Sequence, residues 1–148
     1  KLAYLIFASL IASNCFADDI DDINALLVDY VTSVNELDLA KAESIWSSDD
    51  AISFIHPRGH SKGWDEISST FYLGAMANFS KRDLRLRDIT IRVLSPDTAW
   101  GDFYWDFDAT FNDGSPAQTT GRETQVWKKE TDGWKVVHVH YSGAPVTA

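Results

Sequence analysis

The feature that most constrains the fold is an alternation of apolar and polar residues through the second half of the chain. Successive side chains of a β-strand point to opposite faces of the sheet, so this alternation is typical of strands with one buried face. Four runs carry it, separated by short turn sequences: LRLRDITIRVL, AWGDFYWDFDATF, QTTGRETQVWKKE and GWKVVHVHYSG. Asp113-Gly114, between the second and third runs, is a pair typical of tight hairpins. We therefore predict a meander of long antiparallel strands.

The first half of the chain has the periodicity of helices. Apolar residues three and four positions apart predict an amphipathic helix that starts near residue 18, where four aspartates suit its positive end. DLAKAESIWSS predicts a second helix with Asp38 as its N-cap, and WDEISSTFYLGAMANF predicts a third. Between these two helices, AISFIHP predicts a short strand and RGHSKG a loop.

This order of elements predicts an α+β fold in which one strongly bent antiparallel sheet wraps around the N-terminal helices. Bent sheets use glycines and bulges, and Gly101 and Gly121 both fall inside predicted strands. The length of 148 residues suits a single domain. The net charge of −9 argues against nucleic acid and anionic membranes as partners, because both require a basic surface.

The first 17 residues, KLAYLIFASLIASNCFA, have the pattern of a signal peptide. Cys15 and Ala17 stand at the −3 and −1 positions of a signal-peptidase site that follows a short apolar run. We therefore expect cleavage before Asp18, a domain over residues 18–148, a periplasmic or secreted location, and no membrane contact after cleavage. The alternative is a buried N-terminal helix. Cys15 is the only cysteine, so the cleaved protein is expected to have no disulfide.

Several segments resemble the SnoaL-like branch of the nuclear transport factor 2-like, or cystatin-like, superfamily. They are the acidic first helix, GWDEI after the short strand, GRETQVWKK and DGWKVVHVHYSG. The last two are also similar to the C-terminal part of the association domain of calcium/calmodulin-dependent protein kinase II. The resemblance covers residues 20–145.

The resemblance implies a conical fold with a pocket between sheet and helices, a small-molecule ligand, and a homodimer or higher oligomer formed through the sheet. Trp100, Tyr104 and Trp127 are expected to cover that outer sheet face. The pocket is expected to contain Trp64, Phe103, Trp105, Phe107, Tyr141, His56 and Arg58. The arginines of the association domain's pocket are not carried over, because the matching positions hold Trp105, Ala117 and Tyr141.

His138 and His140 stand two apart in the last predicted strand and therefore share a face. With Glu123 from the adjoining strand they could bind Zn²⁺ or Fe²⁺, but two imidazoles are too few for a strong site, and we expect no metal and no cofactor. Two roles remain: structural or pocket-lining groups, or proton transfer, for which His138, His140 and Glu123 are the catalytic candidates. An inward Glu123 would have a raised pKa, but the alternation does not decide which face is inward.

The loop HPRGH places His56, Arg58 and His60 at the expected mouth of the cone. It is either a solvated polar loop or a contact for an anionic ligand. Nucleophile-elbow and phosphate-binding glycine motifs are absent from the sequence. Two functions remain open: a non-enzymatic ligand-binding or association module, and a cofactor-free isomerase, cyclase or lyase of the ketosteroid isomerase-like type acting on an apolar substrate.

Overall fold

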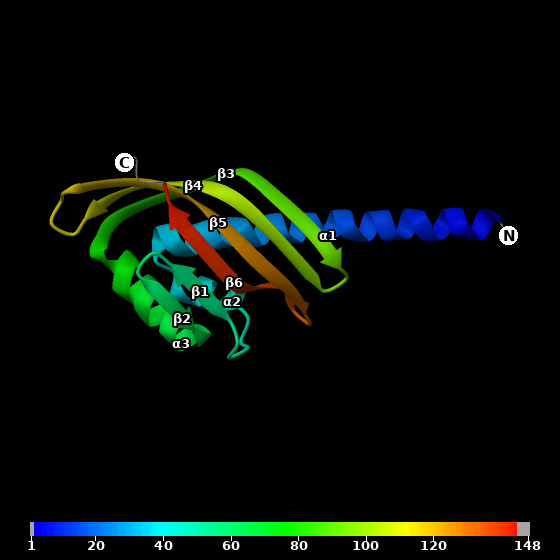
Figure 1. The fold of residues 1–148 in the computed structure, drawn as a ribbon, viewed down its shortest axis with the longest axis horizontal. Helices are drawn as coiled ribbons and strands as arrows, with labels where there is room; N and C mark the ends of the chain where they lie inside the picture. Colours follow the sequence, from blue (N-terminus) through cyan, green and yellow to red (C-terminus); the bar gives the residue numbers. More distant parts are fainter. Residues whose placement is uncertain (1, 145–148) are drawn as a thin grey trace.

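The computed structural model describes residues 2–144, with side chains from residue 17 onward (Figure 1). The side chain of Cys15 and those of most of the predicted signal peptide lie outside the described part. The elements in chain order are α1 (Leu2–Glu36), α2 (Leu39–Ile45), β1 (Ser53–His56), β2 (Gly59–Lys62), α3 (Gly63–Ile67), η1 (Ser68–Ala75), η2 (Met76–Asn78), β3 (Phe79–Ser95), β4 (Thr98–Phe111), β5 (Pro116–Glu130) and β6 (Gly133–Gly143).

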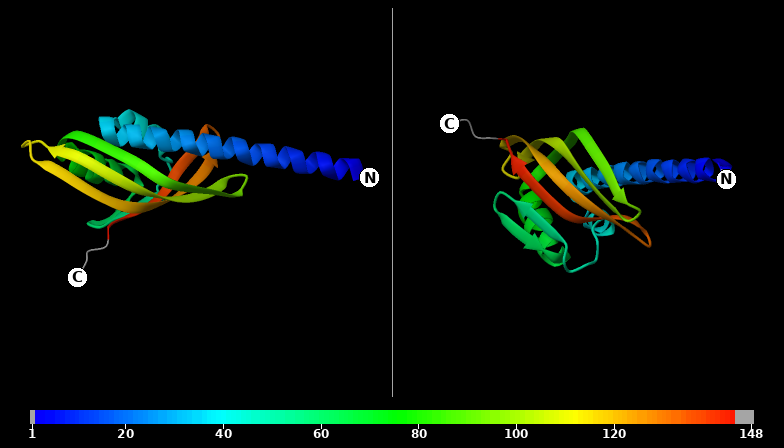
Figure 2. Two further views of the ribbon diagram at one scale, coloured as in Figure 1. Left: turned by 90° about the horizontal axis from the view of Figure 1, so that it is seen from above. Right: turned by 45° about the vertical axis from the view of Figure 1, so that its right-hand side comes forward.

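The strands form one six-stranded sheet in the order β2-β1-β6-β5-β4-β3. The pairs β3–β4, β4–β5 and β5–β6 are antiparallel, which confirms the predicted meander. β1 pairs parallel with β6 and antiparallel with β2, so the early hairpin extends the sheet beside the last strand. The sheet curves over α1, with α2 and α3 below it (Figures 1 and 2). This is the predicted α+β cone.

α1 packs its apolar stripe against the concave face of the sheet. Ile23, Leu27, Tyr30 and Val34 are all at most 2% exposed, and their spacing is that of one helix face. The described residues of the helices include no stretch long and apolar enough to cross a membrane. The Asp38 N-cap of α2 is confirmed, because its carboxylate accepts a hydrogen bond from the backbone N–H of Lys41 at 2.9 Å.

Two glycines leave room for indole rings to pack closely on the inner face of the sheet. A Cβ atom at Gly101 would stand 2.6 Å from Trp127, and one at Gly121 would stand 2.3 Å from Trp105. Their role in bending the sheet stays a prediction, and the structure gives close packing as the reason for glycine at both positions. A bulge at Asp88, whose φ is +55°, adds to the curvature of β3.

The structure corrects two local expectations. Residues 58–63, predicted as a loop, contain β2, in which Ser61 is the buried residue; without apolar alternation, this strand has no sequence signal. The third helix, predicted as regular, changes from α to π geometry at Ser68 and ends in a 3₁₀ turn at Asn78.

The two faces of the last strands differ in burial. Val139 is fully buried on the inner face, so His138 and His140 point to the outer face. Trp127 is also fully buried on the inner face, so the expectation that it covers the outer face is wrong. Tyr104 lies on the outer face and is 46% exposed.

Candidate functional site

A cavity of about 290 Å³ lies between α1, the segment Ser68–Asn78 and the concave face of the sheet. Four strands, the two helical walls and the β1–β2 turn contribute to it. Its lining residues are Tyr30, Val34, Arg58, Phe71, Met76, Phe79, Leu84, Trp105, Phe107, Phe111, Ala117, Gln118, Thr119, Glu123 and Tyr141. Most of these side chains are apolar or aromatic, and the two with an ionisable carboxyl or guanidinium group are Glu123 and Arg58.

Glu123 is the buried acid of this cavity, because β5 turns it to the inner face, where it is 5% exposed. The side-chain amide of Gln125 donates a hydrogen bond to its Oε1 at 2.7 Å. The Tyr30 hydroxyl from α1 donates a longer one to its Oε2 at 3.4 Å. Trp127 Nε1 in turn donates to Gln125 Oε1 at 2.9 Å, which fixes the orientation of that amide. The carboxyl group is therefore held in place by a residue of its own strand and by one of α1.

Burial raises the pKa of Glu123 from 4.5 to about 7, although the hydrogen bonds from Gln125 and Tyr30 act in the opposite direction. Burial also raises the pKa of Tyr30 well above its usual value, and the charge of Glu123 adds to that effect. The phenol thus stays neutral and can donate a hydrogen bond. A carboxyl group with this pKa exists in both protonation states near neutral pH, which is what a general acid or base requires.

Tyr141 and Arg58 form the part of the cavity wall nearest the β1–β2 turn. Tyr141 comes from the inner face of β6, and its ring centroid lies 5.7 Å from that of Trp105. His56 stacks on Tyr141 with 6.3 Å between the ring centroids. Burial raises the pKa of Tyr141, whereas the charge of Arg58 lowers it, so the guanidinium acts electrostatically on this wall.

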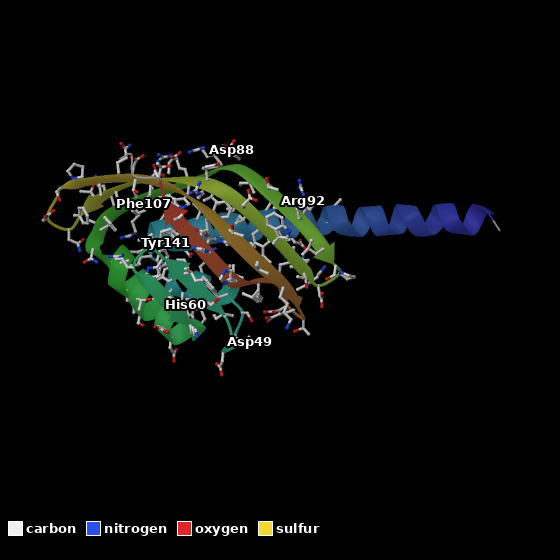
Figure 3. All side chains as sticks on the ribbon, viewed as in Figure 1. Asp49, His60, Asp88, Arg92, Phe107 and Tyr141 are labelled. Carbon is white, nitrogen blue, oxygen red and sulfur yellow. The ribbon has the colours of Figure 1, made fainter. Side chains whose placement is uncertain are left out.

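The structure brings five of the candidate residues to the cavity and places five elsewhere. Trp105, Phe107, Tyr141, Arg58 and Glu123 line it (Figure 3 labels Phe107 and Tyr141). Trp64 instead packs on Tyr72, and Phe103 is buried in the core. His56 lines a smaller neighbouring hollow. His138 and His140 also lie outside the cavity.

The two histidines of the last strand lie outside the cavity. His138 Nδ1 and the Ser53 hydroxyl are 2.7 Å apart, which links β6 to β1. Burial lowers the pKa of His138. His140 is exposed in a hollow of the outer face together with Asp102 and Arg122. Among the described side chains, no three histidine, cysteine, aspartate or glutamate residues gather as a metal site.

Sequence reasoning missed Tyr30 as a site residue. The helical periodicity marked it, with Val31, as a position of the buried face, and its hydroxyl group was the available signal. A tyrosine in an otherwise aliphatic stripe usually finds a polar partner when buried. That partner is 93 positions away in the sequence, so it could not be identified before the fold was known.

Comparison with known proteins places the chain among relatives of one fold. A family model described as a SnoaL-like domain matches residues 23–147. A nuclear transport factor 2-like superfamily protein from Salmonella enterica serovar Typhimurium is 38% identical; the match covers 90% of this chain and 96% of that one, with a TM-score of 0.85. No curated protein matches the chain.

More distant solved structures share the fold alone. A protein with a cystatin-like fold from Caulobacter vibrioides has 20% identity and a TM-score of 0.72, over 86% of this chain and 91% of that one. The hexachlorocyclohexane dehydrochlorinase LinA-type3 from Novosphingobium barchaimii has 14% identity and a TM-score of 0.78, over 91% and 92% of the two chains.

Proposed function

The chain belongs to the family of SnoaL-like domains, and from that premise we propose that it binds a small, mainly apolar molecule in the cavity beside Glu123. The observation that carries this proposal is the cavity itself, about 290 Å³ of space lined mainly by aromatic and aliphatic side chains. Ligand sites have this character: an apolar wall with a few placed polar groups. A cavity left as a packing defect would cost stability without any return.

The binding proposal is tested by filling the cavity. Ala117 lines it from β5 and is partly exposed, so Ala117→Trp places an indole in the space with little strain on the core. The probe is N-phenyl-1-naphthylamine, a neutral apolar dye whose fluorescence rises in apolar surroundings. We expect saturable binding to the unmodified protein and at least a tenfold higher Kd for Ala117→Trp.

The control adds the same side chain elsewhere. Leu94 is 65% exposed on β3 and does not line the cavity, so Leu94→Trp should leave the Kd within a factor of two. Equal binding by the unmodified protein and by Ala117→Trp would contradict the proposal, as would the absence of saturable binding to the unmodified protein.

A second candidate, favoured by the Glu123–Tyr30 pair, is cofactor-free proton transfer on the bound molecule. In such a step the Glu123 carboxylate, positioned by Tyr30, takes a proton from a carbon beside a carbonyl group. The hydroxyl of Tyr141, the other tyrosine of the cavity wall, donates a hydrogen bond to the oxygen that becomes negative. Return of the proton to a different carbon would complete an isomerisation. The pKa of about 7 suits this cycle near neutral pH. Binding without catalysis remains the first proposal because it requires the cavity alone.

Proton exchange distinguishes the two functions. 2-Tetralone is a small bicyclic ketone with acidic α-protons, and NMR in D₂O follows their replacement by deuterium. A catalytic Glu123 would accelerate the exchange at pH 7, and Glu123→Gln would abolish the acceleration while the variant still binds the dye. Exchange at the same rate with both proteins would eliminate proton transfer by Glu123 and leave the binding proposal in place.

A further inference from the structure

We propose that Arg58 makes the cavity selective for amphiphilic anions, whose apolar body enters the cavity while a carboxylate or sulfonate stays at the rim against the guanidinium. This inference rests on the proposed binding function and names its ligand class. The observations behind it are the place of Arg58, its available charge, and the burial of an acid deep in the same cavity.

Arg58 is placed at the rim by the β1–β2 hairpin, of which the sequence predicts β1 alone. It lies in the turn between β1 and β2, and its backbone N–H donates to His56 Nδ1 at 3.3 Å. β1 pairs parallel with β6, so this turn lies beside the end of β6 that carries Tyr141. Arg58 and Tyr141 consequently line both the main cavity and the smaller neighbouring hollow.

The charge of Arg58 is available to a ligand. None of the ion pairs among the described residues includes Arg58. Asp113 lines a hollow at the rim together with Arg58, but no ion pair between the described residues joins the two. The backbone N–H and the hydroxyl of Ser115 both donate to Asp113 Oδ1, at 2.9 Å and 2.6 Å. A guanidinium pairs readily with a carboxylate or a similar planar or tetrahedral anion, often through two hydrogen bonds.

Glu123 determines the orientation of such a ligand. An anionic group pushed to the bottom of the cavity would lose its hydration and face a buried carboxyl group. The same group at the rim keeps part of its hydration and gains the attraction of Arg58. The apolar body then fills the space between Phe107, Leu84 and Tyr30, where burial of apolar surface is favourable.

A pair of matched dyes tests the charge requirement. 8-Anilinonaphthalene-1-sulfonate has the ring system of N-phenyl-1-naphthylamine with one added sulfonate. Loss of a charge-assisted hydrogen bond at a partly solvated site should weaken binding about tenfold. We therefore expect Arg58→Gln to raise the Kd of the sulfonate dye about tenfold and to change that of the neutral dye less than twofold. Arg58→Lys should lie between the two proteins for the sulfonate dye.

The control removes the same charge at a distance from the cavity. Arg92 is an exposed arginine of β3, and its partner in the strand register is Trp100 of β4. The cavity residue Leu84 lies elsewhere on β3, where its register partner is Phe107. Figure 3 shows Arg92 well apart from Phe107 and Tyr141. Arg92→Gln should leave both Kd values within twofold, which separates a local effect from the change in net charge.

The outcomes distinguish this inference from the function on which it rests. If the neutral dye binds in the cavity and Arg58→Gln affects both dyes equally, or neither, the anion selectivity is overturned and the binding function stands. If neither dye binds the unmodified protein, both are overturned. Selective weakening of the sulfonate dye by Arg58→Gln, with Arg92→Gln unchanged, supports the proposal.

Discussion

At the scale of the residue, the site depends on one strand alternation that the sequence left open. Alternate residues of β5 form two sets, one with Glu123, Gln125 and Trp127 and one with Arg122 and its neighbours. Both sets mix polar and apolar side chains, so the alternation alone does not predict which set faces inward. The structure resolves this through Gly121: a side chain at that position would collide with Trp105, so this face must lie against the packed aromatic side. The face with Glu123 is therefore the inner one.

The first prediction concerns the titration of Glu123. Its pKa rises from 4.5 to about 7 on folding. Its contribution to stability is therefore fully present below pH 4.5, and it is lost as the pH rises through 7, where the folded protein must hold a buried carboxylate. That rise corresponds to roughly 3 kcal/mol. We expect the free energy of unfolding of the unmodified protein to fall between pH 5 and pH 8. The free energy of unfolding of Glu123→Gln should fall less over the same range, and the difference between the two falls should be up to about 3 kcal/mol.

Urea unfolding at the two pH values measures this difference. Glu43 is exposed on α2, so Glu43→Gln should reproduce the pH dependence of the unmodified protein. An identical pH dependence for Glu123→Gln and the unmodified protein would contradict a raised pKa at Glu123.

At the scale of the element, the four long strands and the short strand β1 could be predicted, and β2 could not. The long strands have one buried and one solvated face, which produces alternation in the sequence. β2 buries Ser61 through backbone pairing with β1, so its position depends on neighbours rather than on its own composition. Arg58 belongs to this hairpin. Arg58 was expected in the pocket, at the mouth of the cone, and the parallel pairing of β1 with β6 explains how the hairpin brings it to the cavity wall.

The second prediction concerns the close packing of β5 on Trp105. In Gly121→Ala the new methyl group would meet Ser142 O at 2.2 Å and Trp105 Cζ2 at 2.3 Å. Neither the backbone oxygen nor the buried indole can move away easily, so we expect a loss of about 1–3 kcal/mol or more in the free energy of unfolding. Gly143 is the direct partner of Gly121 on β6 and has open space around it. Gly143→Ala should therefore change the free energy of unfolding by less than about 0.5 kcal/mol. Equal effects of the two substitutions on urea unfolding would refute the close packing of Gly121 on Trp105 as the cause.

At the scale of the whole molecule, α1 is longer than the body that it packs against. Figure 1 shows its first half extending beyond the sheet. Among the described side chains, the first buried one is Asp19, at 1% exposed. Its Oδ1 accepts hydrogen bonds from Lys129 Nζ at 2.5 Å and Trp134 Nε1 at 3.1 Å, which tie the helix to the β5–β6 hairpin. The family match begins at residue 23, close to this anchor.

The third prediction joins this anchor to the predicted signal peptide. If the exported protein begins at Asp18, the cleavage leaves Asp19 and its side-chain hydrogen bonds to Lys129 and Trp134 in place. A protein that starts at Asp18 should then unfold with a free energy within about 1 kcal/mol of the full chain. A protein that starts at Asp21 lacks Asp19, so the Nε1–H group of the buried Trp134 loses its acceptor. Its free energy of unfolding should therefore be lower by about 1–3 kcal/mol. Equal stability of the two shortened proteins would contradict the role of Asp19 as the anchor.

N-terminal sequencing of exported material measures the cleavage itself. Retention of Lys1 there would refute the signal prediction without affecting the anchor.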